Sequence, residues 1–479
     1  MRFLSPVTEP GLSKTFLTLF LFCAAAAISS ASTVPTTTYT TLINFNGTDG
    51  GLPEYDYLVQ AFDGNIYGTT QLGGTNNSGA VYKFTPSGTL TSLYSFCAQA
   101  NCADGADPVA GLVEGSDAAY YGTTQIGGAS GNGTVFKITS TGTLTTLHSF
   151  GGSDGANPLS NLILATDGNF YGTTANGGTI GDGTIFKITS AGTLTTIYNF
   201  CTLANCADGS SPVASLLQGT DGNFYGVTRT GGANNDGSVF KVTPAGVLTT
   251  LHSFAGTNGL NPYARLIQAT DGSFYGTTAN GGANSLGTLF KITTTGTFTS
   301  LHSFSGTDGL DVYAGLIQAT DGNFYGTTFG GGTNGNGTVY EMTPAGVVTT
   351  LYSFCSQLNC TDGDYPYAGL VQNTNGVLYG AAAAGGTSDD GVIFTLSLGL
   401  GPFVKTQPLA GKVGTHVTIL GTNLTGATSV TFNGTAATFN VVSKSAITAT
   451  VPTGATTGKV VVTTPKRTLH SNVAFRVMP

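Results

Sequence analysis

Short runs in which apolar and polar residues alternate follow one another from residue 40 onward and predict β-strands. The unit is clear around residues 161–210 and again two repeats later. There the four predicted strands are Leu266–Ala269, Phe274–Thr278, Thr288–Thr293 and Thr297–Phe304. An Asp-Gly turn between the first two predicts a hairpin, because glycine adopts positive φ without strain. The pattern therefore predicts four-stranded antiparallel units.

A Tyr-Gly pair marks one position of this unit and recurs seven times. Its tyrosines are Tyr67, Tyr121, Tyr171, Tyr225, Tyr275, Tyr325 and Tyr379, spaced by 50 or 54 residues. A four-stranded unit of about 50 residues is the size of a propeller blade. The array starts at 40–45, which matches a fourth strand, and ends at 392–395, which matches a third. We therefore predict an all-β, seven-bladed propeller over 32–397, closed by the N-terminal strand.

The repeat D-G-N-F-Y-G-T-T-x-x-G-G, continued by G-T-x-F-K-I-T, resembles the tandem repeats of the exported bacterial choice-of-anchor GloVer-type proteins. The resemblance covers roughly 38–397 and implies an exported surface protein. It brings no established catalytic residues. This chain departs from that family pattern because it shows no C-terminal hydrophobic tail or sorting motif.

A second domain is predicted at 402–479, after a small linker at 398–401. Its predicted strands are Val417–Leu420, Val430–Phe432, Ile447–Val451, Lys459–Thr463 and Ala474–Val477. This pattern indicates an immunoglobulin-like sandwich. The run G-x-V-G-T-H-V-T-I-L-G-T-N-L, with V-T-F-N-G-T-A-A after it, closely resembles the IPT/TIG domain. The segment carries a charge of +7, against −16 for residues 32–401. We expect a solvated basic surface, with docking on the propeller or on an acidic glycan as alternatives.

The composition narrows the function classes. Of the 479 residues, 72 are glycine and only 8% are charged, which excludes a coiled coil. A pI near 4.9 argues against a nucleic-acid partner. The apolar run at 16–28 is 13 residues long, which fits a signal peptide spanning 1–31, and no later run is long enough for a transmembrane segment. We expect a secreted or cell-surface protein.

Six cysteines form three similar pairs, each within F-C-x4-C-x-D-G: Cys97/Cys102, Cys201/Cys206 and Cys355/Cys360. They lie in four-residue insertions of distant repeats, without the paired histidines of a zinc site. Disulfides formed in an oxidising compartment are the favoured interpretation.

Repetition argues for structural roles of the obvious polar residues. The turn aspartates Asp63, Asp167, Asp221, Asp271 and Asp321 are predicted to stabilise turns, and His148, His252 and His302 to occupy packing positions. The loops with Asp104/Asp107, Asp154/Asn157, Asp208, Asp308/Asp311 and Asp362/Asp364 are oxygen-rich. Turn chemistry is the favoured interpretation there, with Ca2+ as an alternative. No other cofactor, catalytic residue or metal site is predicted.

The candidate binding site lies where the repeats differ. Eight residues before each Asp-Gly or Asn-Gly turn stand Tyr55, Val109, Leu159, Val213, Tyr263, Tyr313 and Tyr367. In a closed ring the four tyrosines are neighbours. Tyr57 and Arg265 follow two positions later, and Arg229 and Phe329 start the next loop. These side chains could stack on sugar rings or an extended peptide, whereas packing between blades is the alternative.

We therefore predict a non-enzymatic, monomeric binding or adhesion protein that recognises a glycan or envelope component through one propeller face. A polysaccharide lyase or hydrolase is the first alternative, with Glu54, Asp56 and Asp311 near the site. A structural surface spacer is the second.

Overall fold

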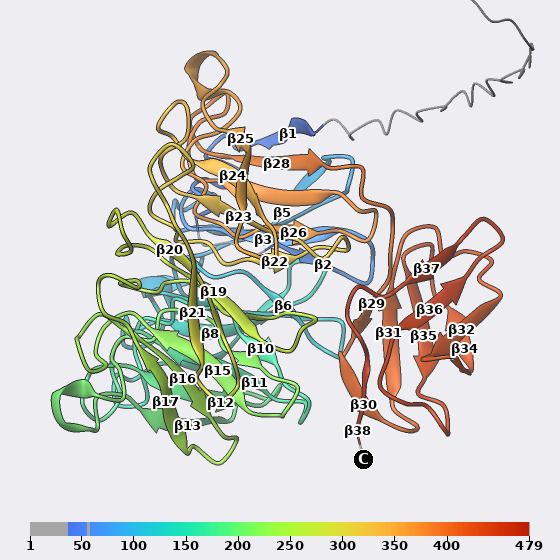
Figure 1. Cartoon of the computed structure of the whole chain (residues 1–479), viewed down its shortest axis with the longest axis horizontal. Coiled ribbons are helices and arrows are strands. Elements are labelled where there is room, and N and C mark those ends of the chain that lie inside the picture. Colours follow the sequence, from blue (N-terminus) through green and yellow to red (C-terminus); the bar gives the residue numbers. More distant parts are fainter. Residues whose placement is uncertain (1–36, 55–57, 479) are drawn as a thin grey trace, which may run out of the picture. The chain divides into compact units, whose positions relative to one another are not determined.

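The computed structural model describes residues 37–54 and 58–478, and it is built almost entirely of β-strands (Figure 1). Within these ranges the helical elements are three short 3-10 turns: η1 (Ala100–Cys102), η2 (Ala204–Cys206) and η3 (Leu358–Cys360). None of the described helical turns has the length and apolarity to cross a membrane. The all-β prediction is confirmed. The predicted signal peptide lies outside the described residues.

Seven four-stranded antiparallel sheets follow one another along the described chain. Sheet one holds β2 (Val59–Gln60), β3 (Ile66–Thr70), β4 (Ala80–Phe84) and β5 (Leu90–Ser95), and sheet two holds β6 (Val113–Glu114), β7 (Tyr120–Thr124), β8 (Thr134–Ile138) and β9 (Leu144–Ser149). Sheet three holds β10 (Ile163–Leu164), β11 (Phe170–Thr174), β12 (Thr184–Ile188) and β13 (Leu194–Asn199), and sheet four holds β14 (Leu217–Gln218), β15 (Phe224–Thr228), β16 (Ser238–Val242) and β17 (Leu248–Ser253). Sheet five holds β18 (Ile267–Gln268), β19 (Phe274–Thr278), β20 (Thr288–Ile292) and β21 (Phe298–Ser303), and sheet six holds β22 (Ile317–Gln318), β23 (Phe324–Thr328), β24 (Thr338–Met342) and β25 (Val348–Ser353). Sheet seven holds β26 (Val371–Gln372), β27 (Leu378–Ala382), β28 (Val392–Ser397) and β1 (Thr38–Asn44).

The second strand of each sheet is buried on both faces, and this explains its composition. All five residues of β19 are buried, so both sides of the strand pack against neighbours. A Cβ atom at Gly276 would lie 2.5 Å from the Phe290 ring, which only glycine avoids. The Tyr-Gly pair of the repeat is therefore a packing requirement.

The N-terminal strand completes the last sheet. β1 pairs with β28, as Figure 1 shows, and its register shifts between Thr41 and Ile43. The other six sheets carry the same irregularity between their third and fourth strands. The Tyr39 ring stacks on Tyr352 of sheet six, with 3.8 Å between ring centroids. The prediction that β1 supplies the missing fourth strand is confirmed.

Successive sheets share hydrophobic clusters, and the series closes on itself. In the described residues, six clusters each join one sheet to the next, and a seventh joins sheet seven to sheet one through residues such as Ile393 and Tyr82. Polar contacts follow the same order. Glutamines of the first strands accept hydrogen bonds from backbone N–H groups of the preceding sheet: Gln60, Gln218, Gln268, Gln318 and Gln372.

The C-terminal residues form two further four-stranded sheets around one apolar core. The first contains β29 (Lys405–Gln407), β31 (His416–Leu420), β35 (Ala446–Thr450) and β34 (Phe439–Val441), and the second β33 (Thr435–Ala436), β32 (Ser429–Phe432), β36 (Val460–Thr463) and β37 (Thr468–His470). β30 (Ala410–Lys412) pairs with β38 (Arg476–Met478) in parallel. Val417, Phe432 and Val460 belong to the shared core. Four of the five predicted strands differ from the observed ones by one residue at each changed end, and the last begins two residues late and ends one residue late.

Candidate ligand-binding face

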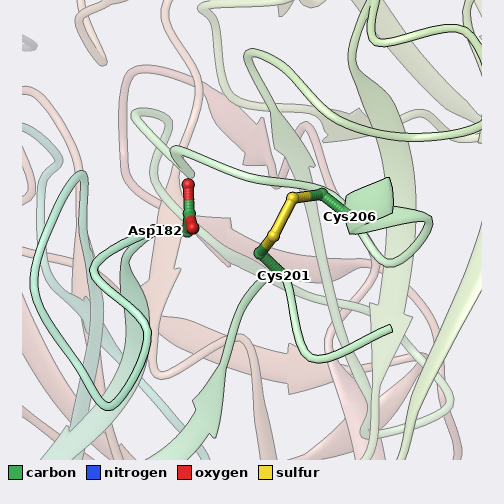
Figure 2. A group of neighbouring side chains, drawn as sticks. All are labelled: Asp182, Cys201 and Cys206. Atoms are coloured by element: carbon green, nitrogen blue, oxygen red, sulfur yellow. A yellow bond between two sulfur atoms is a disulfide. The ribbon is translucent and has the colours of Figure 1, made fainter. Parts of the chain in front are cut away.

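The three predicted disulfides are present, and each closes a loop between two sheets. Cys97–Cys102, Cys201–Cys206 and Cys355–Cys360 enclose the 3-10 turns η1, η2 and η3. Asp182 lies beside the Cys201–Cys206 pair (Figure 2). Metal binding by cysteine needs a thiolate, and these sulfurs are bonded to each other. Asp182 accepts a hydrogen bond from the Ser210 hydroxyl at 2.6 Å, so this group stabilises the loop.

The first aspartate of each Asp-Gly loop binds groups of its own loop and of the strand before it. Asp104 accepts hydrogen bonds from the Tyr94 hydroxyl at 2.8 Å and from two backbone N–H groups. At the repeat position of Tyr94, His148 and His302 instead lie 2.7 Å from Asp154 and Asp308. The predicted packing position therefore also has a polar role, because its Tyr or His side chain binds the loop carboxylate. These contacts are turn chemistry.

The turn aspartates also have local partners. Asp167 accepts a hydrogen bond from the Asn169 backbone at 3.1 Å and from the Tyr171 hydroxyl at 3.0 Å. Lys187 lies 3.1 Å from the same carboxylate. Hydrogen bonding offsets burial and holds the pKa of Asp167 below its usual value. The aspartate and the tyrosine of the repeat thus stabilise one hairpin.

The candidate tyrosines lie in loops that precede the first strands. The sequence predicts Tyr263 and Arg265 at a strand entry, yet β18 begins only at Ile267 because its pairing with β19 spans two residues. Each such loop contains a residue with positive φ: Leu52, Asp107, Asn157, Ser211, Asn261, Asp311 and Tyr365. The backbone carbonyl of each accepts a hydrogen bond from the residue that starts the loop between second and third strands, as from Phe329 to Asp311 at 3.1 Å.

Aligning the repeats by these positive-φ residues shows that Glu54, and not Tyr55, holds the tyrosine position in the first repeat. The repeat position two residues after the positive-φ residue is Val109, Leu159, Val213, Tyr263, Tyr313 or Tyr367. In the first repeat it is Glu54, because one additional residue separates it from the Asp-Gly turn. Tyr55 and Tyr57, with Asp56, lie outside the described residues.

Five aromatic residues contact one another in succession, and we call them the aromatic strip: Tyr263, Tyr313, Phe329, Tyr365 and Tyr367. The ring centroids of Tyr263 and Tyr313 are 5.1 Å apart, and those of Tyr313 and Tyr367 are 4.9 Å apart. Phe329 lies 4.4 Å from Tyr367 and 4.8 Å from Tyr365. Four of the five were predicted from sequence, and the structure brings them together from three sheets.

Arg229 extends one end of the strip. Its guanidinium lies 5.4 Å from the centroid of the Tyr263 ring, within the range of a cation–π contact. Arg265, predicted to join the same surface, lies near Lys405 of β29. Burial and the Arg265 charge lower the pKa of Lys405 to about 8.

Two carboxyl groups accompany the middle of the strip. Burial raises the pKa of Glu54 and that of Asp311 above their usual values. Burial raises the pKa of the Tyr367 hydroxyl to about 12, and the nearby charges of Tyr313, Glu54 and Asp311 add to this effect. The backbone carbonyl of Asp311 accepts hydrogen bonds from the Tyr313 and Phe329 N–H groups at 3.1 Å, which places Asp311 beside the strip. Glu54 holds, in the first repeat, the position that Tyr367 holds in the last.

Tyr365 was missed by the sequence analysis, which expected Glu54 near the site but gave its repeat position to Tyr55. Tyr365 has φ of 53° and is 37% exposed. A tyrosine at a position otherwise filled mostly by Asp, Asn or Ser was a visible signal, since those residues tolerate positive φ better. Alignment by the proline that follows would also have revealed Glu54.

The repeated sheets and their closed series of contacts define an all-β repeat protein. Similarity to known folds agrees: a fungal alcohol oxidase of the AA5 family in complex with copper matches with a TM-score of 0.51 and 13% identity, over 93% of this chain and 100% of that one. The fold it shares is propeller-like.

A family model named the Gloeobacter/Verrucomicrobia repeat matches residues 28–219, 164–394 and 211–445. The chain belongs to this repeat family.

Other similarities are weaker. The periplasmic gluconolactonase PpgL of Pseudomonas aeruginosa matches with 16% identity and a TM-score of 0.41, over 73% of this chain and 97% of that one. A gluconolactonase of Xanthomonas campestris matches with 11% identity and a TM-score of 0.38, over 74% of this chain and 99% of that one. No curated protein matches the sequence.

Proposed function

We propose that the protein is an exported, non-enzymatic binding protein that recognises a glycan or envelope component through the aromatic strip. In this proposal the seven sheets are the blades of a propeller spanning 32–397, which β1 closes. Residues 402–479 form an IPT/TIG domain of immunoglobulin-like fold after the linker 398–401. Export would follow removal of the signal peptide 1–31, and the three disulfides support an oxidising destination.

The aromatic strip is the observation that carries the proposal. Its tyrosines are half-buried or exposed, so part of each ring remains accessible while neighbouring rings limit its movement. Rings held in this way lose little conformational freedom when a ligand stacks on them. Sugar rings offer C–H faces for such stacking and hydroxyls for nearby polar groups. A strip that runs across loops of three sheets suits a ligand of several sugar units.

The double variant Y313V/Y367V tests the proposal. Valine occupies the equivalent positions 109 and 213, so the loops accept it. Loss of two stacking contacts is expected to weaken polysaccharide binding by about 10- to 100-fold. The matched control V109A/V213A changes the same repeat position away from the strip and should bind like wild type. Retention on insoluble polysaccharides and cell envelopes provides the measurement, and unchanged retention of Y313V/Y367V would reject the site.

A polysaccharide-degrading enzyme is the second candidate. The raised pKa values of Glu54 and Asp311 favour it, since a general acid must hold its proton near neutral pH. The same retention assay decides between them, because an enzyme would release soluble sugar into the supernatant and a binding protein would not.

A further inference from the structure

One repeat position contrasts aspartate with asparagine on the same backbone. Asn157 and Asn261 have φ of 52° and 53°, and Asp107 and Asp311 have 54° and 55°. The Asn157 side-chain amide donates to the Gln125 carbonyl at 3.2 Å, and that of Asn261 to the Arg229 carbonyl at 3.1 Å. These bonds tie one sheet to the loop of the preceding sheet. Asparagine therefore suits the fold at this position.

Aspartate cannot form that bond, because a carboxylate has no proton to donate. Asp311 instead accepts one hydrogen bond from the Asn280 amide at 3.1 Å. It is half-buried, and neither lysine nor arginine among the described residues forms an ion pair with it. The fold alone thus favours asparagine at 311. A residue that departs from the local requirement in this way points to a function.

Glu54 departs from its repeat position as well. The equivalent residues in the other repeats are aliphatic or tyrosine. In the described part of the chain, the Glu54 carboxylate forms neither a hydrogen bond nor an ion pair, although the residue is half-buried. The Asp311 backbone carbonyl accepts from the Tyr313 and Phe329 N–H groups at 3.1 Å, and Glu54 holds the repeat position of Tyr367 in the adjoining sheet. Arg229 contacts Tyr263 at the far end.

We propose that the aromatic strip, with Glu54 and Asp311, binds a glycan that carries protonated amino groups. This inference rests on the proposed glycan-binding function and specifies its ligand. An amino sugar would stack its ring on Tyr313 and Tyr367 and place its ammonium group against the two carboxylates. Such charge-assisted hydrogen bonds are stronger than neutral ones, and tyrosine faces also attract cations.

Calorimetric titration with two tetrasaccharides of one backbone tests the proposal. The glucosamine tetramer carries ammonium groups, and the N-acetylglucosamine tetramer carries neutral amides. We expect the wild-type protein to bind the glucosamine tetramer at least about tenfold more tightly. D311N should remove most of this preference and leave the affinity for the acetylated tetramer unchanged.

Two controls separate ligand binding from folding. D107N makes the same change at the same repeat position, away from the strip, and should keep the wild-type preference. D311N introduces the residue that the fold favours, so its thermal midpoint should equal or exceed that of wild type. A lower thermal midpoint of D311N than of wild type would overturn the inference that the fold favours asparagine at position 311.

The remaining outcomes are distinct. Equal binding of the two tetramers, sensitive to Y313V/Y367V, would overturn the amino-group inference and leave glycan binding intact. Tighter binding of a galacturonate tetramer would also overturn it, because that ligand is anionic. Binding of a tetralysine peptide as tight as that of the glucosamine tetramer, insensitive to Y313V/Y367V, would assign the carboxylates to a basic peptide. No binding of any tetramer would reject both proposals.

Discussion

Replacing Glu114 with glutamine is expected to stabilise the protein and to remove most of the pH dependence that this residue imposes on unfolding. Glu114 lies on β6 with only 1% of its surface exposed. Its carboxyl group accepts hydrogen bonds from the Phe62 backbone at 3.2 and 3.3 Å and from the Tyr120 hydroxyl at 3.3 Å. Burial outweighs these bonds and raises the pKa of Glu114 from 4.5 to about 8.

The direction of the effect follows from proton binding. Between pH 4.5 and 8 the folded protein keeps the Glu114 proton, whereas the unfolded chain releases it. The free energy of unfolding therefore falls as the pH rises through this window and levels off above about pH 8. At 1.36 kcal/mol per pKa unit, the loss is about 5 kcal/mol at its limit and roughly 3 kcal/mol at pH 7. These magnitudes are of the order of a domain's whole stability.

Glutamine should fit because five of the other six sheets carry it at this position. There its carbonyl oxygen accepts from the backbone of the preceding sheet, as Gln318 does from Thr270 at 2.9 Å. Its amide donates to the turn of its own sheet, as Gln318 does to the Gly322 carbonyl at 2.9 Å. E114Q can therefore reproduce a contact that already exists elsewhere in the chain, with no ionisable group.

Urea unfolding at pH 5 and pH 8 provides the assay. The midpoints of wild type and E114Q should be similar at pH 5, where both side chains are largely neutral, and E114Q should be clearly more stable at pH 8. Q318E is the reciprocal variant and should acquire a new loss of stability at the higher pH. Parallel pH profiles for wild type and E114Q would refute the reasoning, because they would show that Glu114 does not bind its proton more tightly when folded.

Two further predictions concern closure of the fold. C201A/C206A should lower the free energy of unfolding by roughly 2 kcal/mol, the chain-entropy value for so short a loop. An unchanged urea midpoint would show that the hydrogen bonds that Asp208 accepts from Tyr198, Thr202 and Leu203 suffice to hold this loop. Removal of residues up to Asn46 should lower the thermal midpoint and promote association, since β28 would become an exposed edge. A synthetic peptide of residues 37–46 should restore the monomer in size-exclusion chromatography, and a stable monomer without the peptide would contradict the closure model.

The regular part of the fold was largely predictable because it depends on local periodicity. β19 was predicted at its observed bounds, and β1 was assigned to the last sheet from its similarity to the fourth strands. The first strands were predicted too long. Their apolar residues, such as Leu266, are buried by packing rather than by strand pairing, and a hydrophobic pattern does not separate these two causes.

The candidate site was predictable only in part. Tyr263, Tyr313, Tyr367 and Phe329 stood out because they differ from their counterparts, and they do meet. Tyr365 was not identified, and Glu54 was expected near the site but not at the repeat position of the tyrosines. These placements depend on a left-handed backbone residue and on one additional residue in the first repeat. The contacts of the C-terminal residues with the earlier sheets, such as Gln407 with the Glu114 carbonyl at 2.9 Å, are non-local and leave no periodic signal.

The repeats act as internal references, and they separate two kinds of deviant acid. Glu114 replaces glutamine inside a buried contact between sheets, where the donors it meets are parts of the fold. Asp311 lies at the edge of the aromatic strip, at a position where Asn157 and Asn261 donate to a carbonyl of the preceding sheet, and it accepts a hydrogen bond from Asn280 instead. Both acids should cost stability, but only the second leaves its charge beside a surface that a ligand can reach. E114Q should therefore bind the glucosamine tetramer like wild type while gaining stability, whereas D311N should gain stability and lose the preference for that ligand. If E114Q also lost the preference for the glucosamine tetramer, an acid that differs from its counterparts in the other repeats could not be assigned to binding or to structure on that ground alone.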